Sequence, residues 1–138
     1  PRAQECAFLG AICKKELSPD YNLDQSETYA AIDEFQLFMD RYPNSNLVDS
    51  CNSEIRVLRA KLEKKSYENG KLFYRMEKYR SAVIAFNSTL QTYPDTDYKE
   101  EILFLITFKK SAYIYIHKHK NKNRQKYKNT INFKTFYR

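Results

Sequence analysis

The sequence has 138 residues, which is enough for one domain with a sizeable hydrophobic core. Only two glycines and four prolines occur, while tyrosine and phenylalanine are abundant, and this composition favours helices. Two glycines cannot form a glycine-rich phosphate-binding loop, and the longest apolar run, residues 102–106, is far shorter than the roughly 20 residues of a membrane-spanning helix.

The net charge of +7 is concentrated at the C-terminal end of the chain. Residues 102–138 carry ten basic and no acidic side chains, whereas residues 1–60 carry six basic and ten acidic ones. Aromatic side chains are interleaved with the basic ones, as in some nucleic-acid-binding segments. We expect a solvated segment here, and attraction to nucleic acid, to anionic lipid head groups or to an acidic partner is left open.

The first predicted helix covers residues 3–17 and is followed by a loop at residues 18–22. Gly10 in its middle costs about 1 kcal/mol unless a close helix crossing requires it. One stripe of small and apolar residues is expected to face inward: Ala3, Cys6, Ala7, Gly10, Cys13 and Leu17.

The second predicted helix begins at Asp24, where Glu27 three residues on completes a capping box, and runs to Arg41. Its inward side is expected to carry Tyr29, Ile32, Phe35, Phe38 and Met39.

The third predicted helix is unusually long, because nothing interrupts it between a capping Ser45 and an exit turn at residues 77–78. Its apolar positions recur every three or four residues, which indicates an amphipathic helix. These positions are Leu47, Cys51, Ile55, Leu58 and Leu62, followed by Leu72, Phe73 and Met76.

The fourth predicted helix starts at Tyr79 and ends before Tyr93, because Pro94 cannot continue a helix and pushes Tyr93 out of helical geometry. A fifth is expected from a capping Thr96, with apolar positions continuing to Ile116. We expect a basic loop at residues 117–126 and the start of a further helix at residues 127–138.

Five landmarks of the second and fourth helices recur at one offset, 51 residues. They are Ala31 and Ala82, Phe35 and Phe86, Tyr42 and Tyr93, Pro43 and Pro94, and Ser45 and Thr96. A repeated helix pair predicts a solenoid of stacked helical hairpins.

The three cysteines, Cys6, Cys13 and Cys51, form no C-x-x-C pair, and both histidines lie far from them in the sequence. We therefore expect no metal site and interpret the thiols as buried apolar groups. A disulfide from Cys51 to Cys6 or Cys13 is left open.

Acidic pairs occur at residues 33–34 and 100–101, but adjacent residues point to different sides of a helix, so we interpret them as solvated charges. Together with the missing phosphate loop, this predicts a binding protein that is not an enzyme and has no cofactor.

Binding in such solenoids uses the wall formed by the first helix of each pair. The expected partner-binding positions on that wall are Tyr67, Lys71, Tyr74 and Arg75. The landmarks are interpreted as packing residues: Ala31, Phe35, Tyr42, Pro43, Gly70, Phe73, Ala82, Phe86, Tyr93 and Pro94.

The spacing of Gly70, Ala82, Phe86 and Pro94 resembles a tetratricopeptide repeat, although Ser66 and Asn69 stand where that family prefers Trp and Leu. Two Tyr-Pro-Asn/Asp-Ser/Thr endings separated by a long helix resemble, more narrowly, the BamD family. The stretches 18–25, 61–65, 70–74 and 93–101 resemble its Bacteroidetes branch. That family supplies the lipoprotein component of the outer-membrane β-barrel assembly machine of Gram-negative bacteria. The resemblance covers residues 3–116, and we expect residues 1–116 to form the repeat domain.

The resemblance implies an all-α superhelical scaffold on the periplasmic face of the outer membrane. Its implied partners are the periplasmic domains of the barrel-inserting subunit, other assembly lipoproteins and unfolded outer-membrane proteins, with no nucleic acid. It also implies a lipid anchor that this sequence lacks, since neither Cys6 nor Cys13 follows an apolar leader. The alternative is a basic repeat adaptor that binds nucleic acid or an acidic protein partner.

Overall fold

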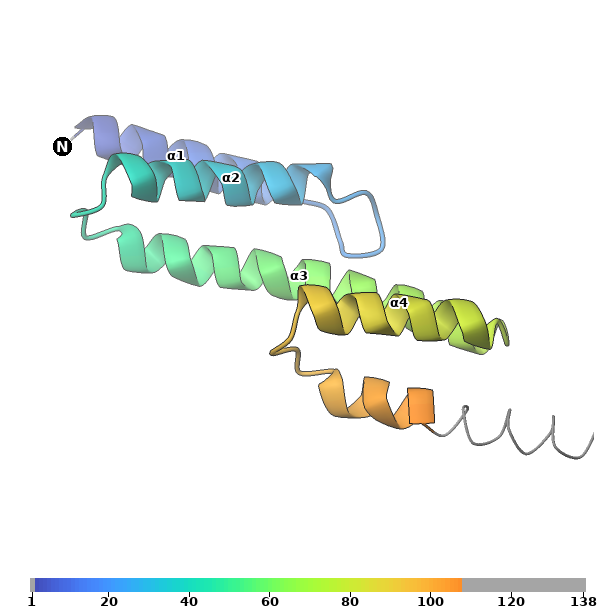
Figure 1. The fold of residues 1–138 in the computed structure, drawn as a ribbon. Helices are drawn as coiled ribbons and strands as arrows, with labels where there is room; N and C mark the ends of the chain where they lie inside the picture. The colour runs from blue at the N-terminus through green and yellow to red at the C-terminus, as the bar shows by residue number, and fades with distance from the viewer. Residues whose placement is uncertain (1, 108–138) are drawn as a thin grey trace, which may run out of the picture. The chain divides into compact units, whose positions relative to one another are not determined.

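The computed structural model describes residues 2–107, which consist of helices and turns without a strand. The helices are α1 (Arg2–Leu17), α2 (Ser26–Arg41), α3 (Val48–Arg75) and α4 (Tyr79–Thr92), and residues 99–107 are also helical (Figure 1). The predicted all-α fold is therefore confirmed. The basic loop and the further helix predicted at residues 117–138 lie outside the described residues.

The chain divides into two compact units, residues 1–96 and residues 97–138, and the four labelled helices all belong to the first. Within it α1 packs on α2, α3 packs on α4, and α2 packs on α3 (Figure 1). These are two tetratricopeptide-like helical hairpins, stacked one on the other. The extent of the repeat domain to residue 116 stays a prediction.

The repeat of 51 residues is visible in the backbone. Tyr42 follows α2 with φ −132° and ψ 61°, and Tyr93 follows α4 with φ −129° and ψ 75°. Each donates its N–H to the carbonyl four residues before it, at 2.9 Å to Phe38 and 2.8 Å to Thr89. Each is followed by an exposed proline, so the same turn leads out of both helices.

The paired landmarks fill the cores of the two hairpins. Phe35 is 0% exposed and Phe86 is 1% exposed, and Ala31 and Ala82 are buried one helical turn before them. Since a residue and its neighbour four positions on share one side of a helix, each small residue admits the partner helix beside the phenyl ring. All four are buried, as their interpretation as packing residues requires.

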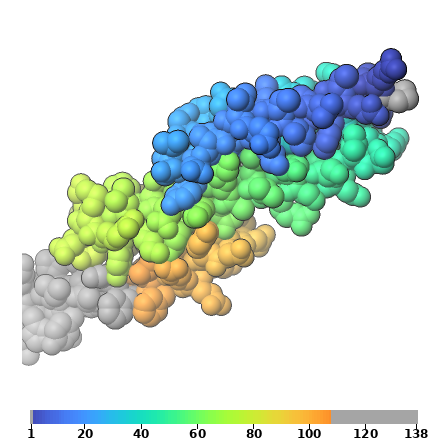
Figure 2. All heavy atoms as spheres, turned by 180° about the vertical axis from the view of Figure 1, so that it is seen from behind, coloured from blue at the N-terminus to red at the C-terminus, as the bar shows by residue number. Residues whose placement is uncertain are grey.

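The predicted inward stripe of α1 is wrong. Of its six residues only Ala7 is partly buried, and the helix instead turns Phe8, Ala11 and Ile12 toward α2 and α3. Figure 2 shows the outward side of α1, in blue. Periodicity misled the prediction because α1 has apolar side chains on both sides.

A second offset identifies the correct side of α1. Phe8 and Ala11 stand 59 residues before Tyr67 and Gly70 of α3. The ring of Phe8 lies 6.2 Å from that of Phe35, and the ring of Tyr67 lies 6.3 Å from that of Phe86. The offset exceeds 51 mainly because eight residues separate α1 from α2 but only three separate α3 from α4, and the remaining difference lies within the helices.

The predicted caps lie just outside the helices that they were expected to begin. Asp24 accepts the N–H of Ser26 at 3.1 Å, but α2 begins at Ser26. Ser45 likewise accepts the N–H of Leu47 at 3.3 Å, whereas α3 begins at Val48. On α2, Tyr29 is 55% exposed and does not face inward as predicted.

Helix α3 has 28 residues, as its uninterrupted sequence predicted. Its predicted apolar positions from Cys51 to Leu62 are buried, but Leu72 and Met76 are 48% and 50% exposed. In its last turns Tyr67 and Gly70 are buried instead, because α4 packs on that side.

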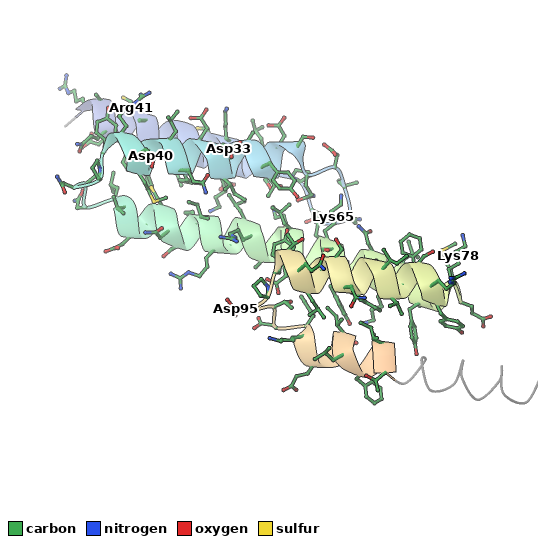
Figure 3. All side chains as sticks on the ribbon, in the orientation of Figure 1. Asp33, Asp40, Arg41, Lys65, Lys78 and Asp95 are labelled. Atoms are coloured by element: carbon green, nitrogen blue, oxygen red, sulfur yellow. The ribbon has the colours of Figure 1, made fainter. Side chains whose placement is uncertain are left out.

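Three lysines of α3 hold the loop between α1 and α2. Lys61 donates to the Ser18 hydroxyl at 2.8 Å, Lys65 donates to the Leu23 carbonyl, and the Lys64 ammonium lies 4.4 Å from the centre of the Tyr21 ring. Figure 3 shows Lys65 beside this loop. The contacts fix the end of the first hairpin on the first helix of the second.

Candidate docking surface on helix α3

One side of α3 carries residues at heptad spacing, and α4 covers only its second half. Residues seven apart lie nearly above one another on a helix. Glu63 accepts a hydrogen bond from the Thr96 hydroxyl at 2.5 Å, where the chain leaves α4. One heptad on, a Cβ on Gly70 would stand 2.5 Å from the Phe86 ring, so only glycine lets α4 approach this closely.

The first half of the same side is open. One and two heptads before Glu63 stand Arg56 and Asp49, and both are exposed. They line an open pocket of about 580 Å³, whose residues are Asp49, Asn52, Ser53, Ile55, Arg56 and Arg59. Helix α4 has 14 residues against 28 in α3, so the pocket occupies the part of the α3 surface that lies beyond the end of α4.

The two arginines of this pocket differ from other basic groups nearby. Lys14 pairs with Glu34 and Lys15 with Glu54, each at 2.8 Å. Hydrogen bonding to those carboxylates raises the pKa of both lysines. Among the described residues Arg56 and Arg59 have no such partner.

Tyr93 borders this region from the turn after α4. Burial raises the pKa of its phenol, the main cause, and the nearby Arg59 charge acts in the opposite direction. Tyr93 also packs against the core of the first hairpin. The aromatic landmark of the second hairpin therefore ties the two hairpins together beside the pocket.

The predicted partner-binding residues belong to the second half of α3, and not all of them are exposed. Tyr67 is 2% exposed, and its hydroxyl accepts a hydrogen bond from Lys71 at 2.9 Å. Tyr74 is half-buried, with its ring 5.9 Å from that of Tyr79. Arg75 is exposed and lies 3.7 Å from Glu68. Their role in binding stays a prediction.

The remaining packing predictions have a mixed outcome. Gly70 is buried, Phe73 and both Tyr42 and Tyr93 are half-buried, and the two prolines are exposed at the helix ends. The prolines therefore act on the backbone by ending helices and do not pack in the core.

The cysteines are free, and the expectation of three buried thiols is correct only for Cys51. Cys6 and Cys13 are exposed on the outward side of α1. Within residues 2–107 no three His, Cys, Asp or Glu side chains come together as a metal site would require. In the same part of the chain, no helix is both long and apolar enough to span a bilayer.

Sequence reasoning missed Arg56 and Arg59. The signal was present, since both share the heptad side of Glu63 and Gly70 on a helix twice as long as its partner. Recognising it required knowing which side of α3 receives α4.

Comparison with known proteins places the chain in a family. A family model described as YfiO, outer membrane lipoprotein, matches residues 3–128. The outer membrane protein assembly factor BamD of Caulobacter vibrioides is 27% identical over 104 residues, which are 75% of this chain and 34% of that protein. The chain thus spans about a third of the length of this curated relative. The resemblance seen in the repeat landmarks is confirmed: the chain belongs to the YfiO family of outer membrane lipoproteins.

Proposed function

We infer that this chain is a docking scaffold of the machinery that assembles β-barrels in the outer membrane of Gram-negative bacteria. It binds the periplasmic domains of the barrel-inserting subunit, contacts other assembly lipoproteins and helps to receive unfolded outer-membrane proteins. The observation that carries this proposal is the family match over residues 3–128. The similarity to an assembly factor named BamD supports it.

The proposed position is the periplasmic face of the outer membrane, with attachment through a lipid anchor. Membership of a lipoprotein family supports the anchor. A scaffold held at that face can present its helices to the periplasmic domains of a barrel protein and to incoming chains.

The proposed role is binding without catalysis. The stacked hairpins support it, because such repeats present continuous helical walls to partner proteins. At the open pocket on α3, the exposed side chains offer guanidinium, amide, hydroxyl and carboxylate groups: Arg56, Arg59, Asn52, Ser53 and Asp49. Lys71, Tyr74 and Arg75 remain predicted contacts in the second half of α3.

Depletion of the full-length protein in its own organism tests this role. The amounts of folded, heat-modifiable β-barrel proteins in the outer membrane should fall, because their assembly would lack its scaffold. Lipoproteins that need no barrel assembly serve as the internal control. Unchanged levels of folded barrels after complete depletion would refute the role.

A further inference from the structure

The open pocket on α3 continues the surface that seats α4. Along this side, the hydroxyls of Thr89 and Ser66 are hydrogen-bonded at 2.7 Å, and the Thr96 hydroxyl donates to Glu63. The next positions toward the start of α3 are Arg59 and Arg56. A second segment that lies in line with α4 would therefore meet two guanidinium groups.

The spacing of these arginines suits a carboxylate. Residues three apart are neighbours on a helix surface, so both guanidinium groups can reach one acidic side chain or two successive ones. Guanidinium groups bind carboxylates through paired, charge-assisted hydrogen bonds. Asn52 and Ser53 line the same pocket and add an amide and a hydroxyl for the backbone of the bound segment.

The charge around the pocket favours a peptide over a polyanion. Asp49 lines its far end, and residues 1–60 contain ten acidic against six basic side chains. A nucleic-acid strand, with a charge on every phosphate, would meet the Asp49 carboxylate as well as the two arginines. A peptide can present a carboxylate to the arginines and uncharged groups elsewhere.

We propose that the pocket of Asp49, Asn52, Ser53, Ile55, Arg56 and Arg59 binds an acidic segment of a protein partner, with a carboxylate held by Arg56 and Arg59. This deepens the docking role proposed above and rests on it for the identity of the partner. The two arginines supply recognition of charge, and the apolar flank at Ile55 accommodates the stem of the acidic side chain.

The test uses a labelled alanine-based peptide with regularly spaced glutamates and its twin with glutamines. Fluorescence anisotropy measures the binding of both to the wild-type chain, to the R56Q/R59Q variant and to an R41Q/R80Q variant. The control removes the same charge from exposed positions on α2 and α4. The basic residues 102–138 are identical in all three proteins, so their background attraction for the peptide is matched.

The preference for the glutamate peptide should fall about tenfold or more in R56Q/R59Q and persist in R41Q/R80Q, as expected for lost charge-assisted hydrogen bonds. In ¹⁵N NMR spectra of the wild type, the glutamate peptide should shift the side-chain Nε–H signals of Arg56 and Arg59. Equal losses in the two double variants would overturn the proposal. So would a larger loss of binding to single-stranded RNA than to the glutamate peptide in R56Q/R59Q.

The proposed carboxylate pocket and the proposed assembly role can be refuted independently of each other. Equal peptide binding by the two double variants overturns the carboxylate pocket, even where depletion lowers the level of folded barrels. Unchanged barrels after depletion overturn the assembly role, even where the pocket prefers glutamate.

Discussion

The two glycines of the chain stand in opposite surroundings. Gly70 faces the Phe86 ring so closely that an added Cβ would stand 2.5 Å from one ring carbon and 2.6 Å from another. Gly10 lies in the middle of α1 with no atom within 4 Å of an added Cβ. The first glycine is required by packing, and the second only costs helix stability.

Alanine should therefore act in opposite directions at these positions. Gly10→Ala should raise the free energy of unfolding by about 0.5–1 kcal/mol through helix propensity. Gly70→Ala should lower it by about 1 kcal/mol or more, because overpacking a buried ring typically costs about 1–3 kcal/mol and outweighs that gain. Urea unfolding followed by circular dichroism measures both, and a stabilising Gly70→Ala would contradict the close seat of α4.

The burial of the Cys51 thiol predicts that the free energy of unfolding falls at alkaline pH. Its side chain is 0% exposed, and burial raises the pKa of its thiol above the ordinary value of 9.0. The folded chain then keeps a proton that the unfolded chain loses, so stability is full below pH 9.0 and declines as the pH rises through the folded pKa. Burial also raises the pKa of the Tyr93 phenol, so Tyr93 adds to the loss of stability as the pH rises above 10.0.

Urea unfolding across this range should show a shallower alkaline decline in Cys51→Ala than in the wild type. Cys13→Ala is the matched control, since that thiol is exposed and should leave the decline unchanged. Equal slopes for the wild type and Cys51→Ala would show that the buried thiol does not govern the decline.

At the scale of elements, a directed hydrogen-bond chain closes the loop between α1 and α2. The Gln25 amide nitrogen donates to the carbonyl of Asp20 at 2.7 Å, so its oxygen is the acceptor for the Thr28 hydroxyl at 2.8 Å. Thr28 must then accept from Ser18 at 2.6 Å, and Ser18 accepts from Lys61. Because each hydroxyl has one proton to donate, the donor and acceptor of every hydrogen bond in this series are fixed.

Thr28→Val, which keeps the shape and removes the hydroxyl, should lower the free energy of unfolding by about 1–3 kcal/mol, because it leaves the buried Gln25 oxygen without a donor. Thr92→Val is the control. Its hydroxyl is exposed and bonds only the Ser88 carbonyl of its own helix, so the change should stay within about 0.5 kcal/mol. Similar losses in both variants, measured by urea unfolding, would mean that the loop network contributes no special stability.

The sequence predicted some elements better than others for physical reasons. Helices α2, α3 and α4 and their turns were predictable, because small residues, phenylalanines and Tyr-Pro pairs constrain packing and backbone together. The inward side of α1 was not, because its apolar residues surround the helix and its partners Phe35 and Phe38 are known only from the fold. Helices α2 and α3 begin one or more residues later than predicted, because the side chains of Asp24 and Ser45 stabilise turns that precede the helices.

The docking surface was the least predictable part. Tyr67 was expected on an open wall, yet the same side of α3 seats α4, and the ring of Tyr67 packs on Phe86. Which half of a long helix stays open depends on the length and register of its shorter neighbour. That is a property of the pair, and no single residue of α3 encodes it.

In the protein taken as a whole, a repeat architecture occurs together with membership of a known family. The second helices of the two hairpins are related by an offset of 51 residues, and each has its own buried phenylalanine and ends in the same kind of turn. The chain belongs to a family of outer membrane lipoproteins. Because the chain spans about a third of its curated relative, these hairpins are proposed as one docking surface within a larger scaffold.

The most direct measurement of the proposed role is affinity purification of the tagged full-length protein from detergent-solubilised outer membranes, followed by mass spectrometry. If the chain is such a scaffold, an outer-membrane β-barrel protein that carries periplasmic domains should be recovered in stable proportion to the tagged protein, and nuclease should not reduce its amount. Recovery of RNA that nuclease removes, with the barrel protein at the level of an untagged control, would contradict the proposed role.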